Sequence, residues 1–183
     1  QYDEWAKTYD SDLLDDLGYV AFREASDIFI DVVPDRNCRV LDVACGTGLA
    51  GEYLKQHGYR NIGGVDLSWE MMAIARQRGA YHATWQHDFT GPADLNELYD
   101  AVLCVGMFSY ATPKISDMHN VVSCARPGAT CVITINGAAW QELELEPEVY
   151  READLNRFTI EEIRKARYIE KEGIDSRVLV ITR

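Results

Sequence analysis

A strand that carries an acid, followed by a glycine-rich turn, gives the clearest chemical signal in this sequence. Residues 39–44 read Arg-Val-Leu-Asp-Val-Ala and predict a short strand, and Gly46 and Gly48 follow before a predicted helix. Glycines there let the chain bend tightly and let a ligand approach the backbone. The spacing of Gly46, Gly48 and Gly51 also satisfies the dinucleotide-binding fingerprint, which alone is a weak signal. The turn is therefore a predicted ligand site.

Asp66 supplies the second half of that site. It ends the next predicted strand, residues 61–65. A carboxylate in this position can accept hydrogen bonds from both hydroxyls of a ribose, so the pair of features indicates an adenosine-type cofactor. The alternative is that Asp66 only caps the helix that follows.

Asp42 separates two classes of cofactor. It lies within the first strand, close before Gly46, where its charge would repel the pyrophosphate of a nicotinamide dinucleotide. The same charge suits the ammonium and sulfonium of S-adenosyl-L-methionine (SAM), whose product is S-adenosyl-L-homocysteine (SAH). Charge therefore favours SAM over a nicotinamide-dependent dehydrogenase, which stays an alternative. Asp42 could also simply balance nearby backbone donors.

The order of the motifs resembles that of class I SAM-dependent methyltransferases. Residues 41–48 resemble the family's first motif, with Ala44 where many members have glycine. Residues 2–10 resemble the N-terminal cap of the small methyltransferase-like proteins associated with the Williams–Beuren syndrome region, and the resemblance spans residues 2–183. Later motifs are matched by residues 66–72, 87–89, 99–104 and 126–129.

This resemblance implies a set of cofactor contacts. Asp66 would hold the ribose and Asp88 the adenine amino group, although Asp88 could instead cap a turn and Met71 could belong to the core. Trp5 and Tyr9 could likewise be ordinary packing residues of a first helix. The other implied contacts are Trp5, Tyr9, Asp42, Ala44, Cys45, Gly46, Thr47, Gly48, Leu67, Met71, Phe89 and Val105.

Alternating strands and helices must position these residues. Such a pattern predicts an α/β fold, a Rossmann-like seven-stranded, mostly parallel sheet with helices on both faces. We expect a single domain over 1–183, with 1–35 as a helical cap over the cofactor site. Predicted strands cover 39–44, 61–65, 81–86, 99–105 and 129–135, and predicted helices 13–32, 48–57, 68–78 and 116–125, with a turn at 126–128.

The end of the chain breaks this alternation. We expect a helix over 160–166, then two runs, 167–172 and 176–182, around a turn at Gly173. No helix fits between the two runs, so they should form an antiparallel hairpin at the sheet edge.

The residues that would bind the methyl acceptor are less clearly indicated, because several motifs of known acceptor classes are absent. Residues 104–108 read Cys-Val-Gly-Met-Phe, without the Asp/Asn-Pro-Pro pattern for base amines, and no acid ends this strand, so no metal is predicted. His119 is the one candidate for an assisting base, with a solvent-facing helix residue as the alternative. Acids over 142–148 read as a solvated loop or as a site for a cationic substrate. Candidate pocket residues are Phe108, Tyr110, Asn136 and Trp140.

Composition and net charge exclude several classes of binding partner. The net charge is −12, which argues against nucleic acid or anionic membranes, and no apolar run is long enough to span a bilayer. Five cysteines without a CxxC pair favour buried thiols in the cytoplasm. The expected function is methyl transfer from SAM to a small-molecule acceptor, with oxygen slightly favoured. A non-catalytic use of the cofactor, in a cyclisation or in partner binding, is the alternative.

Overall fold

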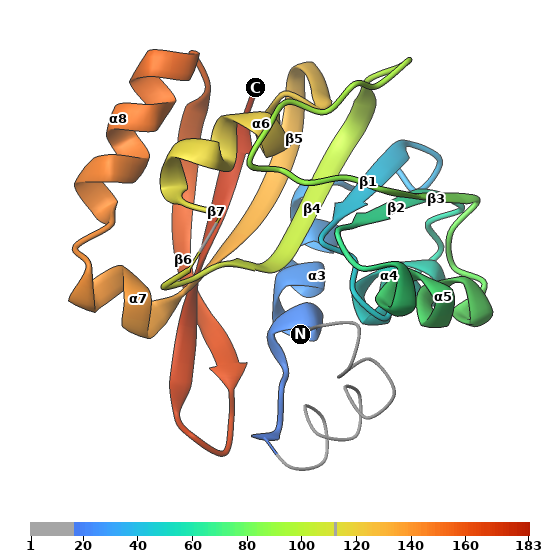
Figure 1. The fold of residues 1–183 in the computed structure, drawn as a ribbon, viewed down its shortest axis with the longest axis horizontal. Helices are drawn as coiled ribbons and strands as arrows, with labels where there is room; N and C mark the ends of the chain where they lie inside the picture. The colour runs from blue at the N-terminus through green and yellow to red at the C-terminus, as the bar shows by residue number, and fades with distance from the viewer. Residues whose placement is uncertain (1–16, 112) are drawn as a thin grey trace.

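A seven-stranded sheet forms the centre of the computed structural model, which describes residues 17–111 and 113–183 (Figure 1). The strand order is β3-β2-β1-β4-β5-β7-β6. The first five strands in this order are parallel, whereas β7 runs antiparallel to both β5 and β6. The strands are β1 Arg39–Val43, β2 Asn61–Asp66, β3 Ala83–Gln86, β4 Tyr99–Phe108, β5 Ala125–Asn136, β6 Thr159–Ile169 and β7 Ile174–Thr182.

Helices cover both faces of this sheet, as predicted. Alternate strand residues point to opposite faces, so Val40 belongs to one core with residues of α3 and α4, while Leu41 and Val43 belong to another with residues of α6 and α8. Each face thus has its own apolar core. The helices are α3 Ala21–Val32, α4 Leu49–Gln56, α5 Trp69–Arg78, the 3₁₀ helix η2 Ile115–Asp117, α6 Met118–Val122, α7 Gly137–Glu142 and α8 Glu146–Asn156.

The antiparallel C-terminal hairpin is confirmed, but the helix expected over 160–166 is wrong. Those residues lie within β6, which pairs with β7 along its whole length. Ile160, Ile163 and Ala166 have helical spacing, and the charged residues between them have good helix propensity. Pairing with β7 overrides this local preference, and the charges of β6 suit an edge strand because they face solvent.

Two helices, α7 and α8, occupy the region between β5 and β6 where none was predicted. The acidic segment 142–148 is therefore not one loop, since α8 begins at Glu146. Pro147 lies in the first turn of α8, and Glu146 and Glu148 complement the positive end of its dipole. These acids are a helix-start signal.

Three further boundaries differ from the predictions. Of the helix expected over 13–32, α3 covers Ala21–Val32, whereas Gly18 before it has φ +68° and Tyr19 pairs with Ile169 of β6. The helix expected over 116–125 is shorter, because η2 and α6 together end at Val122. The turn expected at 126–128 lies inside β5, where the pairing with β4 is irregular and Gly128 has φ +80°. Gly128 N–H there donates to the Arg183 carbonyl at 2.7 Å. Residues 1–16, including Trp5, Tyr9 and nearly half of the expected cap, lie outside the described residues.

Candidate functional site

The turn after β1 has a special backbone. Ala44, Gly46 and Gly48 have φ of +56°, +53° and +91°, in the left-handed region that favours glycine. Two backbone hydrogen bonds close the turn: Cys45 N–H donates to the Val65 carbonyl at 3.0 Å, and Gly48 N–H to the Cys45 carbonyl at 2.8 Å. Gly48 then precedes the first residue of α4. The turn is thus fixed against the end of β2.

Asp66 holds the two sides of this turn together. Its Oδ2 accepts from Gly46 N–H at 2.8 Å, and its Oδ1 accepts from Ser68 N–H at 2.9 Å. Ser68, not Asp66, is the residue that caps α5, because its hydroxyl accepts from Met71 N–H at 3.2 Å. The carboxylate of Asp66 is therefore oriented at the carboxyl end of β2, beside the glycine turn.

The three glycines of the fingerprint meet different surroundings. A methyl group added at Gly46 would meet no atom within 4 Å. At Gly48 and Gly51 it would lie 3.1 Å and 2.4 Å from the ring of Tyr81. Gly46 therefore leaves space for a ligand, whereas Gly48 and Gly51 make room for a tyrosine.

Asp42 lies in the interior, with only 1% of its surface exposed. Tyr81 donates a 2.7 Å hydrogen bond from its hydroxyl to Asp42 Oδ2. Burial raises the pKa of Asp42 to about 7, the nearby Asp66 charge adds to the rise, and the Tyr81 hydroxyl and Gly51 N–H oppose it. Asp42 therefore gains or loses its negative charge near neutral pH, and its burial and these partners determine the pH at which it does so.

The other predicted cofactor residues lie around the same edge of the sheet. Leu67 is 59% exposed directly after Asp66, while Met71 and Phe89 are buried. Asp88 Oδ1 accepts from Thr90 N–H at 2.9 Å, which lowers the pKa of Asp88 and forms the turn that was its alternative reading. The roles of these residues, and of Cys45, buried Thr47 and Val105 near the end of β4, stay predictions.

The predicted acceptor residues are more dispersed. Tyr110 is 53% exposed, whereas Phe108 and Trp140 are buried. Asn136 caps α7 by accepting from Ala139 N–H at 3.0 Å. His119 lies half-buried on α6, where its Nδ1 is 2.7 Å from the Ser116 carbonyl. Among residues 17–111 and 113–183, no three His, Cys, Asp or Glu side chains gather as a metal site would need, and no helix is long and apolar enough to cross a membrane.

Two tyrosines that the sequence analysis did not name meet at Gly106 of β4. A methyl group at Gly106 would lie 3.1 Å from the Tyr19 hydroxyl and 3.5 Å from that of Tyr168. The two rings pack edge to face, with centroids 5.4 Å apart. No local motif marks them, because one precedes α3 and the other lies in β6. They place two hydroxyl groups beside Gly106 of β4.

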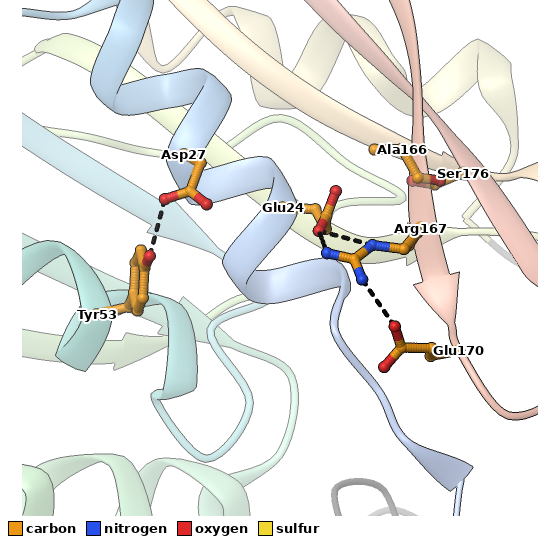
Figure 2. A network of polar contacts seen from close by, with 7 residues as sticks. All are labelled: Glu24, Asp27, Tyr53, Ala166, Arg167, Glu170 and Ser176. Carbon is orange, nitrogen blue, oxygen red and sulfur yellow. Dashed lines mark hydrogen bonds and ion pairs between the residues drawn. The ribbon is translucent and has the colours of Figure 1, made fainter.

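A second polar cluster, the Arg167 cluster, lies on the surface between α3 and β6 (Figure 2). The Arg167 guanidinium pairs with Glu24 of α3 and, at 2.7 Å, with Glu170. Nearby, Tyr53 of α4 donates to Asp27 of α3 at 2.8 Å. Glu24, Arg167 and Glu170 also line a cavity of about 410 Å³ beside the β6–β7 hairpin. The ion pairs of Arg167 connect α3 to this hairpin at the surface.

A comparison with protein families defines the class. Residues 40–128, which contain the glycine turn with Asp42, Asp66 and Asp88, match the family described as "Methyltransferase domain". This part of the chain is thus similar to that family's domain, and the resemblance indicated by its motifs is confirmed.

The chain is also similar to individual methyltransferases of known name. The chain is 36% identical over 115 residues to Methyltransferase-like protein 27 of Homo sapiens, covering 59% of this chain and 45% of that protein. It is 30% identical over 99 residues to a ubiquinone biosynthesis O-methyltransferase of Hydrogenovibrio crunogenus, covering 50% and 40% of the two chains. The chain thus matches less than half the length of these relatives.

Solved structures confirm the Rossmann-like fold. A SAM-dependent methyltransferase from Clostridium acetobutylicum superposes with a TM-score of 0.69 at 16% identity, covering 99% of this chain and 98% of the other. The magnesium protoporphyrin IX methyltransferase of Synechocystis, with bound SAH, gives 0.66 at 16% identity over 87% and 81%. At such identities the likeness establishes the fold alone.

Proposed function

We propose that this protein transfers a methyl group from SAM to a small-molecule acceptor, with an oxygen acceptor favoured. The observation that carries the proposal is the link between Asp66 and the glycine turn, which brings an oriented carboxylate beside the open side of Gly46. The family match supports methyl transfer, and the ubiquinone biosynthesis relative supports oxygen.

The residues present fit this cofactor. Asp66 would accept from the ribose hydroxyls, exposed Leu67 would pack on the adenine, and Asp42 would give the site negative charge for a cationic end. SAM, when bound, supplies an activated methyl group on a positively charged sulfur. The open side of Gly46 leaves the backbone accessible to a ligand, as the turn of such a site requires.

The protein's part in the reaction is mainly alignment. Holding two reactants in line contributes roughly 7–11 kcal/mol, whereas a general base raises the rate by about 10²–10⁴-fold. His119 is the candidate general base, although its Nδ1 faces the Ser116 carbonyl. The hydroxyls of Tyr19 and Tyr168 at Gly106 would orient an acceptor. We therefore expect an acceptor that ionises easily, such as a phenol, enol or carboxylate, or a free amine.

The packing of Tyr81 argues against the nicotinamide alternative. The fingerprint match of Gly48 and Gly51 is accounted for by the tyrosine ring that fills the space beside them. Asp42 beneath the turn adds a charge that a pyrophosphate would avoid.

Calorimetric titration of the full chain with SAH, SAM and NAD⁺ tests the proposal. We expect binding of SAH and SAM and none of NAD⁺, and Asp66→Ala should weaken SAH binding by on the order of 2–4 kcal/mol because bonds to charged groups are lost. Asp27→Asn, a change of a surface carboxylate on α3, should leave binding unaltered. Binding of NAD⁺ without SAH would overturn the assignment.

Methyl transfer itself needs a second measurement. Labelled SAM and a panel of phenols, carboxylic acids and amines should show transfer to at least one small acceptor. Persistent absence of transfer, with SAH binding intact, would favour a non-catalytic use of the cofactor.

A further inference from the structure

Tyr81 is enclosed by three glycines from three different elements. A methyl group would lie 2.4 Å from its ring at Gly51 of α4, 3.0 Å at Gly64 of β2 and 3.1 Å at Gly48 of the turn. Any side chain at Gly51 would overlap the ring, because real Cβ contacts do not approach so closely. The ring therefore lies beneath the glycine turn, between β2 and α4, and fixes their separation.

The hydroxyl of this ring reaches the central strand. It donates to Asp42 Oδ2 at 2.7 Å, across 39 residues of sequence. The carboxylate has almost no solvent exposure, so the hydroxyl and the Gly51 N–H replace water as its hydrogen-bond donors. Tyr81 thus connects the glycine turn, through one buried hydrogen bond, to the acid below it.

We propose that Tyr81 is a positioning residue of the cofactor site, which holds Asp42 as a carboxylate and keeps the glycine turn in shape for the cationic end of SAM. The inference rests on the proposed function, since it assigns a role to a side chain behind that site. Tyr81 acts through Asp42 and the turn.

The charges around Asp42 explain why a donor is needed. Asp66 at the end of β2 opposes ionisation of Asp42, and the thiols of Cys45 in the turn and Cys104 in β4 also lie in its field. Among residues 17–111 and 113–183, no cation opposes them in setting the pKa of Asp42. The pKa of Tyr81 is itself raised, so its hydroxyl stays a neutral donor. Loss of this donor must raise the pKa of Asp42 further.

The test uses Tyr81→Phe, which keeps the ring and removes only the oxygen. SAH affinity is measured by calorimetry between roughly pH 6 and 9 for the full chain. We expect wild-type affinity to rise with pH up to about 7, where Asp42 ionises. The midpoint should move upward by about one unit or more in Tyr81→Phe, with affinity at least about fivefold weaker at pH 7 and equal affinity at the highest pH.

A matched control is available in Tyr53→Phe. Tyr53 donates to Asp27 at 2.8 Å, nearly the same bond, but the exposed Asp27 is solvated. This variant should reproduce the wild-type profile. In an Asp42→Asn background, Tyr81→Phe should have no further effect on the pH profile, because the group it acts on no longer titrates.

Three outcomes separate the hypotheses. An unchanged profile in Tyr81→Phe, or an equal loss of affinity at every pH, would overturn the role of Tyr81 while the proposed function stands. Absence of SAH binding by the wild type would instead overturn the proposed function. The carboxyl carbon of Asp42, followed by NMR without cofactor, gives an independent readout: its titration midpoint should rise in Tyr81→Phe.

Discussion

The glycine-turn region and the Arg167 cluster use similar polar contacts in opposite environments. The Tyr81–Asp42 and Tyr53–Asp27 hydrogen bonds have lengths of 2.7 and 2.8 Å, yet one is buried and the other lies at the surface. A buried polar group cannot exchange its partner for water, whereas an exposed one can. Burial, and not bond length, therefore decides which of the two hydrogen bonds affects stability and cofactor binding.

The largest effect should come from the charge of Asp42. The folded pKa of about 7 exceeds the ordinary value of 3.8, so the folded state retains a proton that the unfolded state loses between these values. Stability should therefore fall as pH rises from about 4 to 7, by on the order of 3 kcal/mol, and Asp42→Asn should lack this fall. Urea unfolding at pH 5 and pH 8 measures it. Equal slopes for both proteins would contradict the burial argument.

A smaller effect is expected from crowding the tyrosine ring. Gly51→Ala should destabilise the protein by about 1–3 kcal/mol, because the added methyl group overlaps Tyr81. Gly91→Ala is the matched control, since its methyl group would come no closer than 4.0 Å to another atom. Thermal unfolding of the two variants separates overlap from a general cost of replacing glycine. Equal melting temperatures would show that the ring can move aside.

Relieving the turn should stabilise it slightly. Ala44 has φ +56°, a conformation that costs a non-glycine residue about 1 kcal/mol. Ala44→Gly removes this strain but adds freedom to the unfolded chain, so the expected gain is below about 1 kcal/mol. Denaturant titration at pH 7 checks the sign, and a loss of stability would mean that the alanine methyl group contributes packing that outweighs the strain.

The smallest effect should appear in the Arg167 cluster. Arg167→Gln removes the pairs with Glu24 and Glu170, which solvent already screens. We expect no measurable change in melting temperature or in SAH affinity at 0.15 M salt. A clear loss of either would place this surface among the determinants of the fold and end the contrast with the glycine-turn region.

Local sequence was sufficient where a strand, a turn and a helix follow one another. The conformation of the residues around Gly46 and Asp66 follows from their local sequence. The parallel half of the sheet and the placement of these residues could therefore be predicted. Residues 160–166 could not, because their pairing partner in β7 decides between helix and strand. The contact of Tyr81 with Asp42 could not be predicted either, because no sequence pattern near residue 81 indicates a partner 39 positions earlier.

The five cysteines give the fold an internal reporter. Cys38, Cys45, Cys104, Cys124 and Cys131 are all free and buried. Burial raises the pKa of Cys38 to about 11 and that of Cys124 to about 12, so neither forms the reactive thiolate at neutral pH. A thiol-modifying reagent would therefore label these positions only when the chain opens. Because Cys45 lies in the glycine turn and Cys131 in β5, the order in which they are labelled would map which half of the sheet opens first.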